Sequence, residues 1–425
     1  MSEQMKPSGI DWIGDIPIDW EIGKVRFVTA LRGEKGFYTE KDKYIGLENI
    51  SSYTGEYLSS ETEYDSGIYD VYKKGDLLFN KLRPYLAKAL IANDDGFCTG
   101  ELEVISEYKG DKRYLFYYLL SDGFLKMVDA STYGTKMPRA NWDYIKNFSI
   151  PLLPSKEQTA IADYLDKQCN KIDGIISDLE TQIDTLQRYK KSLILETVTK
   201  GLNKKAPMKP SGIDWIGDIP GHWALQRIKD ISTMQTGTTP PNNEGINFDN
   251  DGSPWFTPGD FTEGSIVLRS SEKNVDNETI QRESIRLYPK HSILFVGIAS
   301  IGKLGYFEHE SYSNQQITAV KPNNIKSSKF IAYALLASMD YTKSNALYTT
   351  VPIINNAYLG LIKIPFPNID EQIIIADYLD ARCAKIDMIL QDKQTQLETI
   401  KQHKKSLIYE YVTGKKRVKE KCNGN

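Results

Sequence analysis

Cysteine and histidine are scarce in this sequence of 425 residues, which contains four of each. The cysteines are Cys98, Cys169, Cys383 and Cys422. They are far apart, so neither a disulfide framework nor a zinc ligand set is expected. The histidines also lack the spacing of a metal site. The sequence therefore predicts no metal centre of its own.

Long hydrophobic runs are also missing. No apolar run approaches the ~20 residues that a membrane-spanning helix needs. The opening residues, MSEQMKPSGIDWIG, lack the apolar region of a signal peptide. We therefore expect a cytoplasmic protein. Its length predicts two or three domains, and 40% hydrophobic residues suit folded cores.

Motifs of enzyme active sites are likewise absent. There is no G-x-S-x-G, and no G-x-G-x-x-G follows a strand. The Asn-Pro-Pro-aromatic motif of amino-group methyltransferases is missing too. No catalytic residue is therefore assigned, and the sequence favours a binding or scaffolding protein over an enzyme.

One segment imitates a phosphate-binding loop. Gly297–Lys303 (GIASIGK) fits G-x-x-x-x-G-K, but Leu304 stands where such a loop carries Ser or Thr. The next residues read as a strand, whereas a phosphate-binding loop opens a helix. We interpret the segment as a strand-to-strand turn with Lys303 at its tip. The rival hypothesis, an NTPase, requires activity to fall in Lys303→Ala.

Positive charge is not in excess, because 53 Lys and Arg oppose 56 Asp and Glu, for a net charge of −3. A nucleic-acid binder working alone usually has a basic balance or a basic face. The net charge therefore supports a rival hypothesis, a coiled-coil adaptor that binds proteins. It leaves room for a local basic groove, or for a partner that supplies phosphate contacts. Steep salt dependence of binding to duplex DNA would separate these hypotheses.

Two long segments repeat each other. Glu157–Gly201 and Glu371–Lys415 are identical at 25 of 45 aligned positions, without a gap. Their apolar residues recur in steps of three and four, which predicts long helices that pair along a heptad seam. Lys190 and Lys404 interrupt the seam. They could set the register of pairing, mark a docking site, or extend to solvent as snorkelling lysines. The residues expected in helix–helix packing are Leu165, Ile172, Leu179, Leu186, Leu379, Ile386, Leu397 and Leu407.

A second repeat precedes each variable block. Met5–Pro17 and Met208–Pro220 share the thirteen residues MKPSGIDWIGDIP. The blocks that follow show no obvious identity, and their short apolar runs, separated by turns, predict an α+β fold with mainly antiparallel sheets. A helix is expected over 113–128, interrupted at Gly123, and a strand over 266–268. The expected parts are a first domain at 1–154, a long helix at 155–202, a second domain at 203–369, and a helix with a basic tail at 370–425.

Polar loops of both blocks suit DNA. Arg can bind guanine with two hydrogen bonds, Asn and Gln can bind adenine, and Lys and Tyr suit phosphates. Lysine at the tip of the GIASIGK turn suits a phosphate contact. Taken singly, each loop is more often merely solvated, but basic clusters recur. The candidate DNA-binding residues are Lys81, Arg83, Tyr85, Lys88, Lys136, Arg139, Asn141, Thr238, Lys303, Asn314, Gln315 and Gln316.

The chain as a whole resembles the specificity subunit of type I restriction-modification systems. The likeness rests on the repeated KPSGIDWIGDIP, on KGDLLFNKLRPYLAKA and GTKMPRANW, on SILFVGIASIGKLGYF and SNQQITAV, and on the two EQ…IADYLD…KKSLI segments. The resemblance implies two target-recognition domains, separated by two long antiparallel coiled-coil helices. Each domain would read one half of a bipartite site in double-stranded DNA.

The resemblance also implies partners. Two methyltransferase (modification) subunits would bring S-adenosylmethionine, and restriction subunits would bring ATP and Mg²⁺. The chain itself would bind no cofactor. Such partners agree with the missing catalytic motifs and with the weak net charge.

Overall fold

The computed structural model describes residues 4–134, 136–239, 248–344 and 353–418. The chain forms two compact units: unit 1 comprises residues 1–180 and 394–425, and unit 2 comprises residues 181–393. Helices α5 (Ser155–Lys200) and α11 (Ile369–Val412) both continue across this boundary. Each unit therefore contains one variable block and a part of both long helices.

Unit 1 begins with the repeated motif, which forms a hairpin of β1 (Met5–Pro7) and β2 (Asp15–Pro17). Next, β3 (Glu21–Lys24) pairs antiparallel with β12 (Ser149–Leu152), so the start and the end of the variable block lie together. The helices of the block are α1 (Val25–Val28), α2 (Lys112–Leu119), α3 (Asp122–Ala130) and α4 (Trp142–Ile145). Short 3-10 turns lie at η1 (Leu47–Asn49) and η2 (Pro84–Leu86).

Two four-stranded sheets form the rest of this block. The first has the order β4 (Thr29–Leu31), β11 (Leu102–Tyr108), β8 (Leu77–Asn80), β9 (Ala89–Ile91), all antiparallel. The second has the order β5 (Lys35–Tyr38), β7 (Gly67–Tyr72), β10 (Gly96–Cys98), β6 (Tyr44–Ile45). Only the β10–β6 pair of these sheets is parallel.

The first sheet is buried on both faces. Leu77, Phe79 and Ile105 belong to a cluster shared with the helices, whereas Leu78 and Val104 belong to a cluster shared with the second sheet. Successive side chains of a strand point to opposite faces, so residues 77–79 of β8 and residues 104–105 of β11 are apolar at consecutive positions. This packing fixes the ends of β8 and β11, where candidate site residues lie.

The helix expected over 113–128 is two helices, α2 and α3. The break comes before Gly123, where a Cβ atom would lie 2.1 Å from the ring of Trp12. Glycine thus allows the repeated motif to pack closely on α3.

Unit 2 has the same layout. Its motif forms the hairpin β13 (Met208–Pro210) and β14 (Asp218–Pro220), and β15 (Ala224–Arg227) pairs with β23 (Lys363–Phe366). A four-stranded antiparallel sheet has the order β16 (Ser232–Thr236), β22 (Ile317–Pro322), β19 (Ser292–Val296), β20 (Leu304–Phe307). A second sheet has the order β18 (Lys273–Val275), β17 (Phe248–Phe256), β21 (Tyr312–Ser313).

The helices of this block are α6 (Ile228–Ile231), α7 (Asn277–Arg282), α8 (Ser328–Ala337), α9 (Met339–Ser344) and α10 (Asn356–Leu361). The 3-10 turns are η4 (Pro258–Asp260) and η5 (Ile325–Ser327). The strand expected over 266–268 was wrong: this segment makes only an isolated bridge from Val267 to Tyr306.

The variable blocks share a topology that their sequences conceal. In unit 1, Leu102 of β11 pairs with Asn80 of β8. At the same place in unit 2, Ile317 of β22 pairs with Val296 of β19. The predicted α+β class with two repeated domains is confirmed, and the repeat extends into the blocks themselves.

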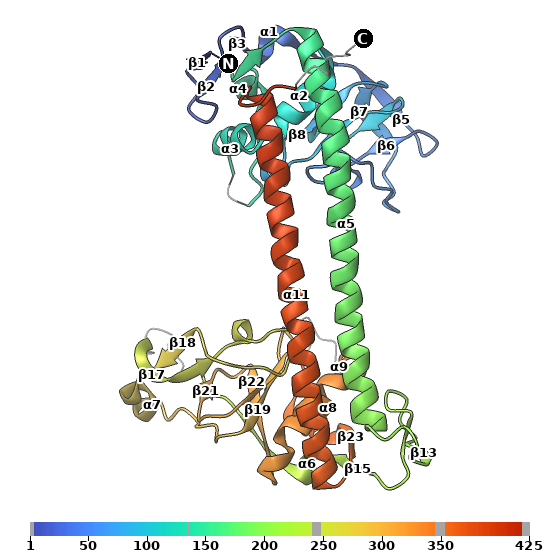
Figure 1. Cartoon of the computed structure of the whole chain (residues 1–425), viewed down its shortest axis with the longest axis vertical. Helices are drawn as coiled ribbons and strands as arrows, with labels where there is room; N and C mark the ends of the chain where they lie inside the picture. Colours follow the sequence, from blue (N-terminus) through green and yellow to red (C-terminus); the bar gives the residue numbers. More distant parts are fainter. Residues whose placement is uncertain (1–3, 135, 240–247, 345–352, 419–425) are drawn as a thin grey trace, which may run out of the picture. The chain divides into compact units, whose positions relative to one another are not determined.

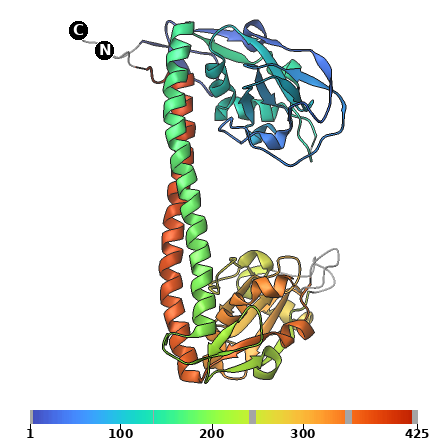
Figure 2. The same ribbon diagram turned by 90° about the vertical axis from the view of Figure 1, so that its right-hand side faces the viewer.

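Segments of α5 and α11 lie side by side in each unit (Figures 1 and 2). In unit 1 the Tyr164 ring lies 4.5 Å from that of Tyr411, and Asp173 binds Lys404. The later residue of α5 thus contacts the earlier residue of α11, which confirms that the two helices run antiparallel within unit 1. Of the expected packing residues, Leu186 is half-buried, and seven are buried: Leu165, Ile172, Leu179, Leu379, Ile386, Leu397 and Leu407.

The two seam lysines are buried. Lys190 binds Asp387 within unit 2, and Lys404 binds both Asp173 and the carbonyl of Tyr53 within unit 1. The interpretation of these residues as lysines that reach out to solvent was wrong. Among the described residues, no helix combines the length and the apolar character that a membrane span needs.

Candidate nucleic-acid interface

Three segments of unit 1 meet where β8 ends and β11 begins. The backbone N–H of Lys81 donates to the carbonyl of Glu101 at 2.9 Å, and that of Ala140 donates to Lys81 at 2.9 Å. Leu82 and Tyr133 each form an antiparallel bridge with Arg139. Glu101, Lys81, Arg139 and Tyr133 therefore lie on four neighbouring stretches of backbone, which we call the unit 1 row.

Charged side chains of this row are paired. Arg139 binds the carboxylate of Glu101, and the ammonium of Lys81 lies 2.9 Å from that of Glu103. Arg139 remains 45% exposed, and Tyr133 is 61% exposed. The row thus offers a cation and an aromatic ring to solvent, and both suit nucleic acid. Sequence reasoning found the cations but missed both carboxylates.

The turn after Lys81 brings two more candidates to this region. Arg83 has a backbone φ of 52°, which is rare for residues other than glycine. Its backbone N–H donates to the Pro138 carbonyl at 2.7 Å. Its guanidinium donates to the carbonyl of Lys136 at 3.3 Å. Lys136 is exposed, and Tyr85 in η2 is 49% exposed. These residues therefore extend the accessible cationic and aromatic surface.

Two other candidates bond inside the fold. The ammonium of Lys88 donates to the carbonyl of Leu47 at 2.6 Å, and burial lowers the pKa of Lys88. The side chain of Asn141 accepts from the N–H of Asp143 at 2.8 Å and so caps α4. The contacts of Lys88 and Asn141 support the β8–β9 connection and α4, and a DNA contact by either stays a prediction.

In unit 2 the amide candidates come together. Asn314 donates to the side-chain oxygen of Gln316 at 2.9 Å, and the N–H of Gln315 donates to the Thr239 hydroxyl at 3.0 Å. The latter bond places Thr238 beside this group. Gln315 is exposed, whereas Asn314 and Gln316 are half-buried. Unit 2 therefore offers neutral hydrogen-bonding groups where unit 1 offers charged ones.

Lys303 does not join the amide group. Its ammonium points to the carbonyl of Pro258 at 3.4 Å, as that of Lys88 points to Leu47. The segment Gly297–Lys303 links β19 to β20, so it is a strand-to-strand turn as predicted. It does not open a helix, which leaves the NTPase hypothesis without its structural requirement.

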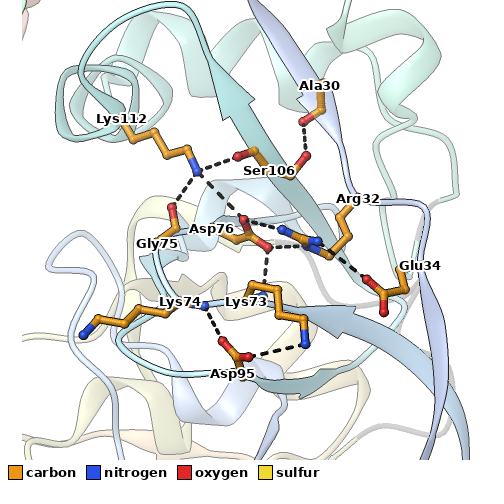
Figure 3. A network of polar contacts seen from close by, with 10 residues as sticks. All are labelled: Ala30, Arg32, Glu34, Lys73, Lys74, Gly75, Asp76, Asp95, Ser106 and Lys112. Carbon is orange, nitrogen blue, oxygen red and sulfur yellow. Dashed lines mark hydrogen bonds and ion pairs between the residues drawn. The ribbon is translucent and has the colours of Figure 1, made fainter.

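A charged network supports the first sheet of unit 1 (Figure 3). Asp76 is 2% exposed and accepts from the guanidinium of Arg32 at 2.6 and 3.2 Å, and from the N–H of Lys73 at 2.9 Å. The hydrogen bond to Asp76 raises the pKa of Arg32. Lys112, at the start of α2, donates to the carbonyls of Gly75 and Ser106 at 2.7 and 2.6 Å. The network fastens β4, the β7–β8 turn and α2 together, and so positions β8.

Within the described ranges, no group of three or more His, Cys, Asp or Glu residues could hold a metal ion. Cys98, Cys169 and Cys383 are buried free thiols, and burial raises the pKa of Cys98 to about 12. Cys422 lies outside the described residues. The interface candidates are therefore groups that bind through hydrogen bonds, charge and stacking.

The model of the type I restriction modification DNA specificity domain family matches residues 17–185 and 220–399. The chain belongs to this family. Each matched segment begins at the proline that ends a repeated hairpin, Pro17 or Pro220, and ends within a long helix. The family match therefore falls on the two structural repeats.

Relatives of the whole chain are found in Methanocaldococcus jannaschii. The specificity subunit of the type I restriction enzyme MjaVIII is 26% identical, with 95% of this chain and 94% of the relative covered. The putative MjaX specificity subunit is also 26% identical, with 96% of each covered. A chain from a solved structure, described as concerning complex assembly and conformational transition of the type I R-M system, has a TM-score of 0.68 at 17% identity. The alignment covers 93% of this chain and 98% of that chain, and it supports the fold described above.

Proposed function

We propose that this chain selects the DNA sequence on which a type I restriction-modification complex acts, and that it is itself non-catalytic. One observation carries the proposal: two specificity-domain segments of the same topology present loops at the same strand ends, with different side chains. A protein that reads a bipartite site needs such a common frame with different contact residues. Relatives that match the whole chain and are named as specificity subunits support it.

DNA binding would divide between two kinds of contact. Tyr85 and Lys136 are exposed and suit the phosphate backbone, whereas Arg139 and the amides near Gln316 suit base edges in the major groove. A chain with a net charge of −3 has little attraction for DNA beyond such patches. Strong binding would therefore depend on subunits that enclose the duplex.

The partners would be two modification subunits and restriction subunits. The modification subunits would supply S-adenosylmethionine, and the restriction subunits would supply ATP and Mg²⁺. This division fits a chain without recognisable catalytic motifs. We propose that the complex works in the cytoplasm.

Competition in gel-shift experiments tests the proposal. The chain is mixed with its modification subunits and a labelled duplex that contains a candidate bipartite site. Unlabelled duplexes with that site should compete far better than duplexes with scrambled half-sites. Equal competition by all duplexes, for every candidate site tried, would contradict the proposal. A steep fall of affinity with salt would count against the adaptor hypothesis.

A further inference from the structure

Three of the four backbone stretches of the unit 1 row, those of Glu101, Lys81 and Arg139, have a counterpart in unit 2. The N–H of Gly297 donates to the Gln316 carbonyl at 2.9 Å, as that of Lys81 does to Glu101. The N–H of Ile354 donates to Gly297 at 2.8 Å, as that of Ala140 does to Lys81. Ile298 bridges to Ile353, as Leu82 bridges to Arg139. We call Gln316, Gly297 and Ile353 the unit 2 row.

In unit 2, uncharged residues replace both members of each ion pair of the unit 1 row. Where unit 1 has Glu101 and Arg139, unit 2 has Gln316 and Ile353. The second ion pair of unit 1 is replaced in the same way: Gly297 stands at the position of Lys81, and Thr318 at that of Glu103. Carboxylate and cation are therefore present together or absent together.

The fold does not require the ion pair of Glu101 and Arg139. Unit 2 builds the three corresponding stretches of the ladder without charges in its row. Arg139 is 45% exposed, and such pairs contribute little to stability. A carboxylate beside a DNA phosphate backbone is also repelled, which makes Glu101 costly in an interface that needs only affinity.

Glu101 also has unused bonding capacity. One carboxylate oxygen, Oε1, binds Arg139. The other, Oε2, is enclosed and, among the described residues, has no hydrogen-bond donor. An enclosed carboxylate oxygen without a donor is costly. The Glu101 side chain as a whole is 23% exposed, so rotation of its carboxylate can present this oxygen to a donor on a ligand. In DNA, the exocyclic amine of cytosine is a donor that suits a carboxylate.

Resting on the proposed function, we propose that Arg139 and Glu101 together read one G·C base pair in the half-site bound by unit 1. Arg139 donates two hydrogen bonds to O6 and N7 of guanine, and Glu101 accepts one from the cytosine amine. Both acceptors and the donor lie on the major-groove edge of the same base pair. The uncharged unit 2 row cannot make this set of contacts.

The test uses the full chain assembled with its modification subunits. Competition by duplexes that carry each single base-pair change in the half-sites gives the discrimination at every position. For the wild type, replacing the G·C pair should reduce competition by about 5- to 150-fold. Arg139→Lys keeps the charge but lacks the two-pronged guanidinium, so it should lose this discrimination while it retains general affinity. Glu101→Gln should weaken discrimination at the same position, because the amide adds a competing donor.

Lys146→Ala is the matched control, since Lys146 forms an exposed ion pair with Asp143 in the same unit but outside the row. It should leave base discrimination at the wild-type level, and thermal unfolding of each variant checks its fold. Unchanged discrimination in either row variant would overturn the proposal, as would a uniform loss for all duplexes in Arg139→Lys. Either result would leave the proposed function intact, provided that the wild type still prefers a bipartite site. A wild type without such a preference would instead refute the proposed function.

Discussion

At the scale of single residues, each of the two long helices contributes one buried lysine that is paired with an aspartate of the other helix. Lys404 is 6% exposed and lies 2.7 Å from both carboxylate oxygens of Asp173, which is 19% exposed. Lys190 is 7% exposed, but its partner Asp387 is 41% exposed. A buried ammonium without a counter-charge is strongly unfavourable, so a shifted register would be disfavoured.

Replacing Lys404 by Met should lower the free energy of unfolding of unit 1 by about 3 kcal/mol, because it leaves the Asp173 carboxylate buried without a partner. The matched change Lys190→Met should lower that of unit 2 by only about 1 kcal/mol, because water can solvate Asp387. Hydrogen exchange by mass spectrometry, on peptides of each unit, measures both. Equal losses would contradict this account.

The network around Asp76 gives a second prediction at this scale. Asp76→Asn should destabilise unit 1 by about 2–4 kcal/mol, because Arg32 and Lys112 lose their buried counter-charge. Asp95→Asn is the control, since the Asp95 side chain is 60% exposed in the same network, and should change stability by less than about 0.5 kcal/mol. Thermal unfolding compares the two. A loss as large for Asp95→Asn would show that burial is not what gives Asp76 its importance.

Sequence reasoning found residue types at this scale but not their partners. Lys88 and Arg139 look alike in the sequence, yet the first binds a backbone carbonyl 41 residues away and the second lies at the surface. Glu101 was missed because a search for DNA contacts looks for cations and amides. Its proposed role depends on a ladder between the residue before β11, the β8–β9 connection and the loop before α4, which no local pattern encodes.

At the scale of elements, the long helices were predicted well because their pattern is local. An apolar seam in steps of three and four specifies a helix without any long-range information. The helix expected at 155–202 spans 155–200. Short strands were predicted less well: 266–268 has the apolar residues of a strand but pairs only through Val267. Strand formation depends on a partner, which the sequence of the segment does not reveal.

The length of the helices gives a prediction for this scale. Both helices are continuous across the unit boundary, at residues 180–181 and 393–394. Insertion of seven residues into each at this boundary preserves the heptad seam and adds about 10 Å of helix. We expect a longer spacer between unchanged half-sites. Mapping of methylated positions checks this, and altered half-site sequences would contradict it.

At the scale of the whole molecule, the chain is circularly repetitive. In unit 2 the hairpin motif follows α5 through a short linker, and Trp223 packs against Gly201 at the end of α5. In unit 1 the same motif packs against the end of α11, with Trp20 against Gly414, although no peptide bond joins them. Arg417 binds Asp19 there, and the Lys415 ammonium binds the carbonyl of Asp15.

A circular permutant should therefore fold. Its ends would lie in the linker 203–207, and a short linker would join Arg417 to Gln4. We expect its free energy of unfolding to lie within about 1 kcal/mol of that of the original chain, because each broken connection has an equivalent in the other unit. Chemical unfolding measures this, and the permutant should keep the same half-sites. Failure to fold would mean that the peptide linker between α5 and the hairpin of unit 2 is not equivalent to the contact between α11 and the hairpin of unit 1.

The most direct test of the central claim is a map of methylated bases in a host that expresses this chain with its modification subunits, made by long-read sequencing. We expect methylation within a single bipartite motif, in which two defined half-sites flank a spacer of fixed length and undefined sequence. In Arg139→Lys, one half-site should become degenerate while the other stays intact. Methylation in one uninterrupted motif, or a motif unaffected by exchange of either variable block, would contradict the claim that each unit reads its own half-site.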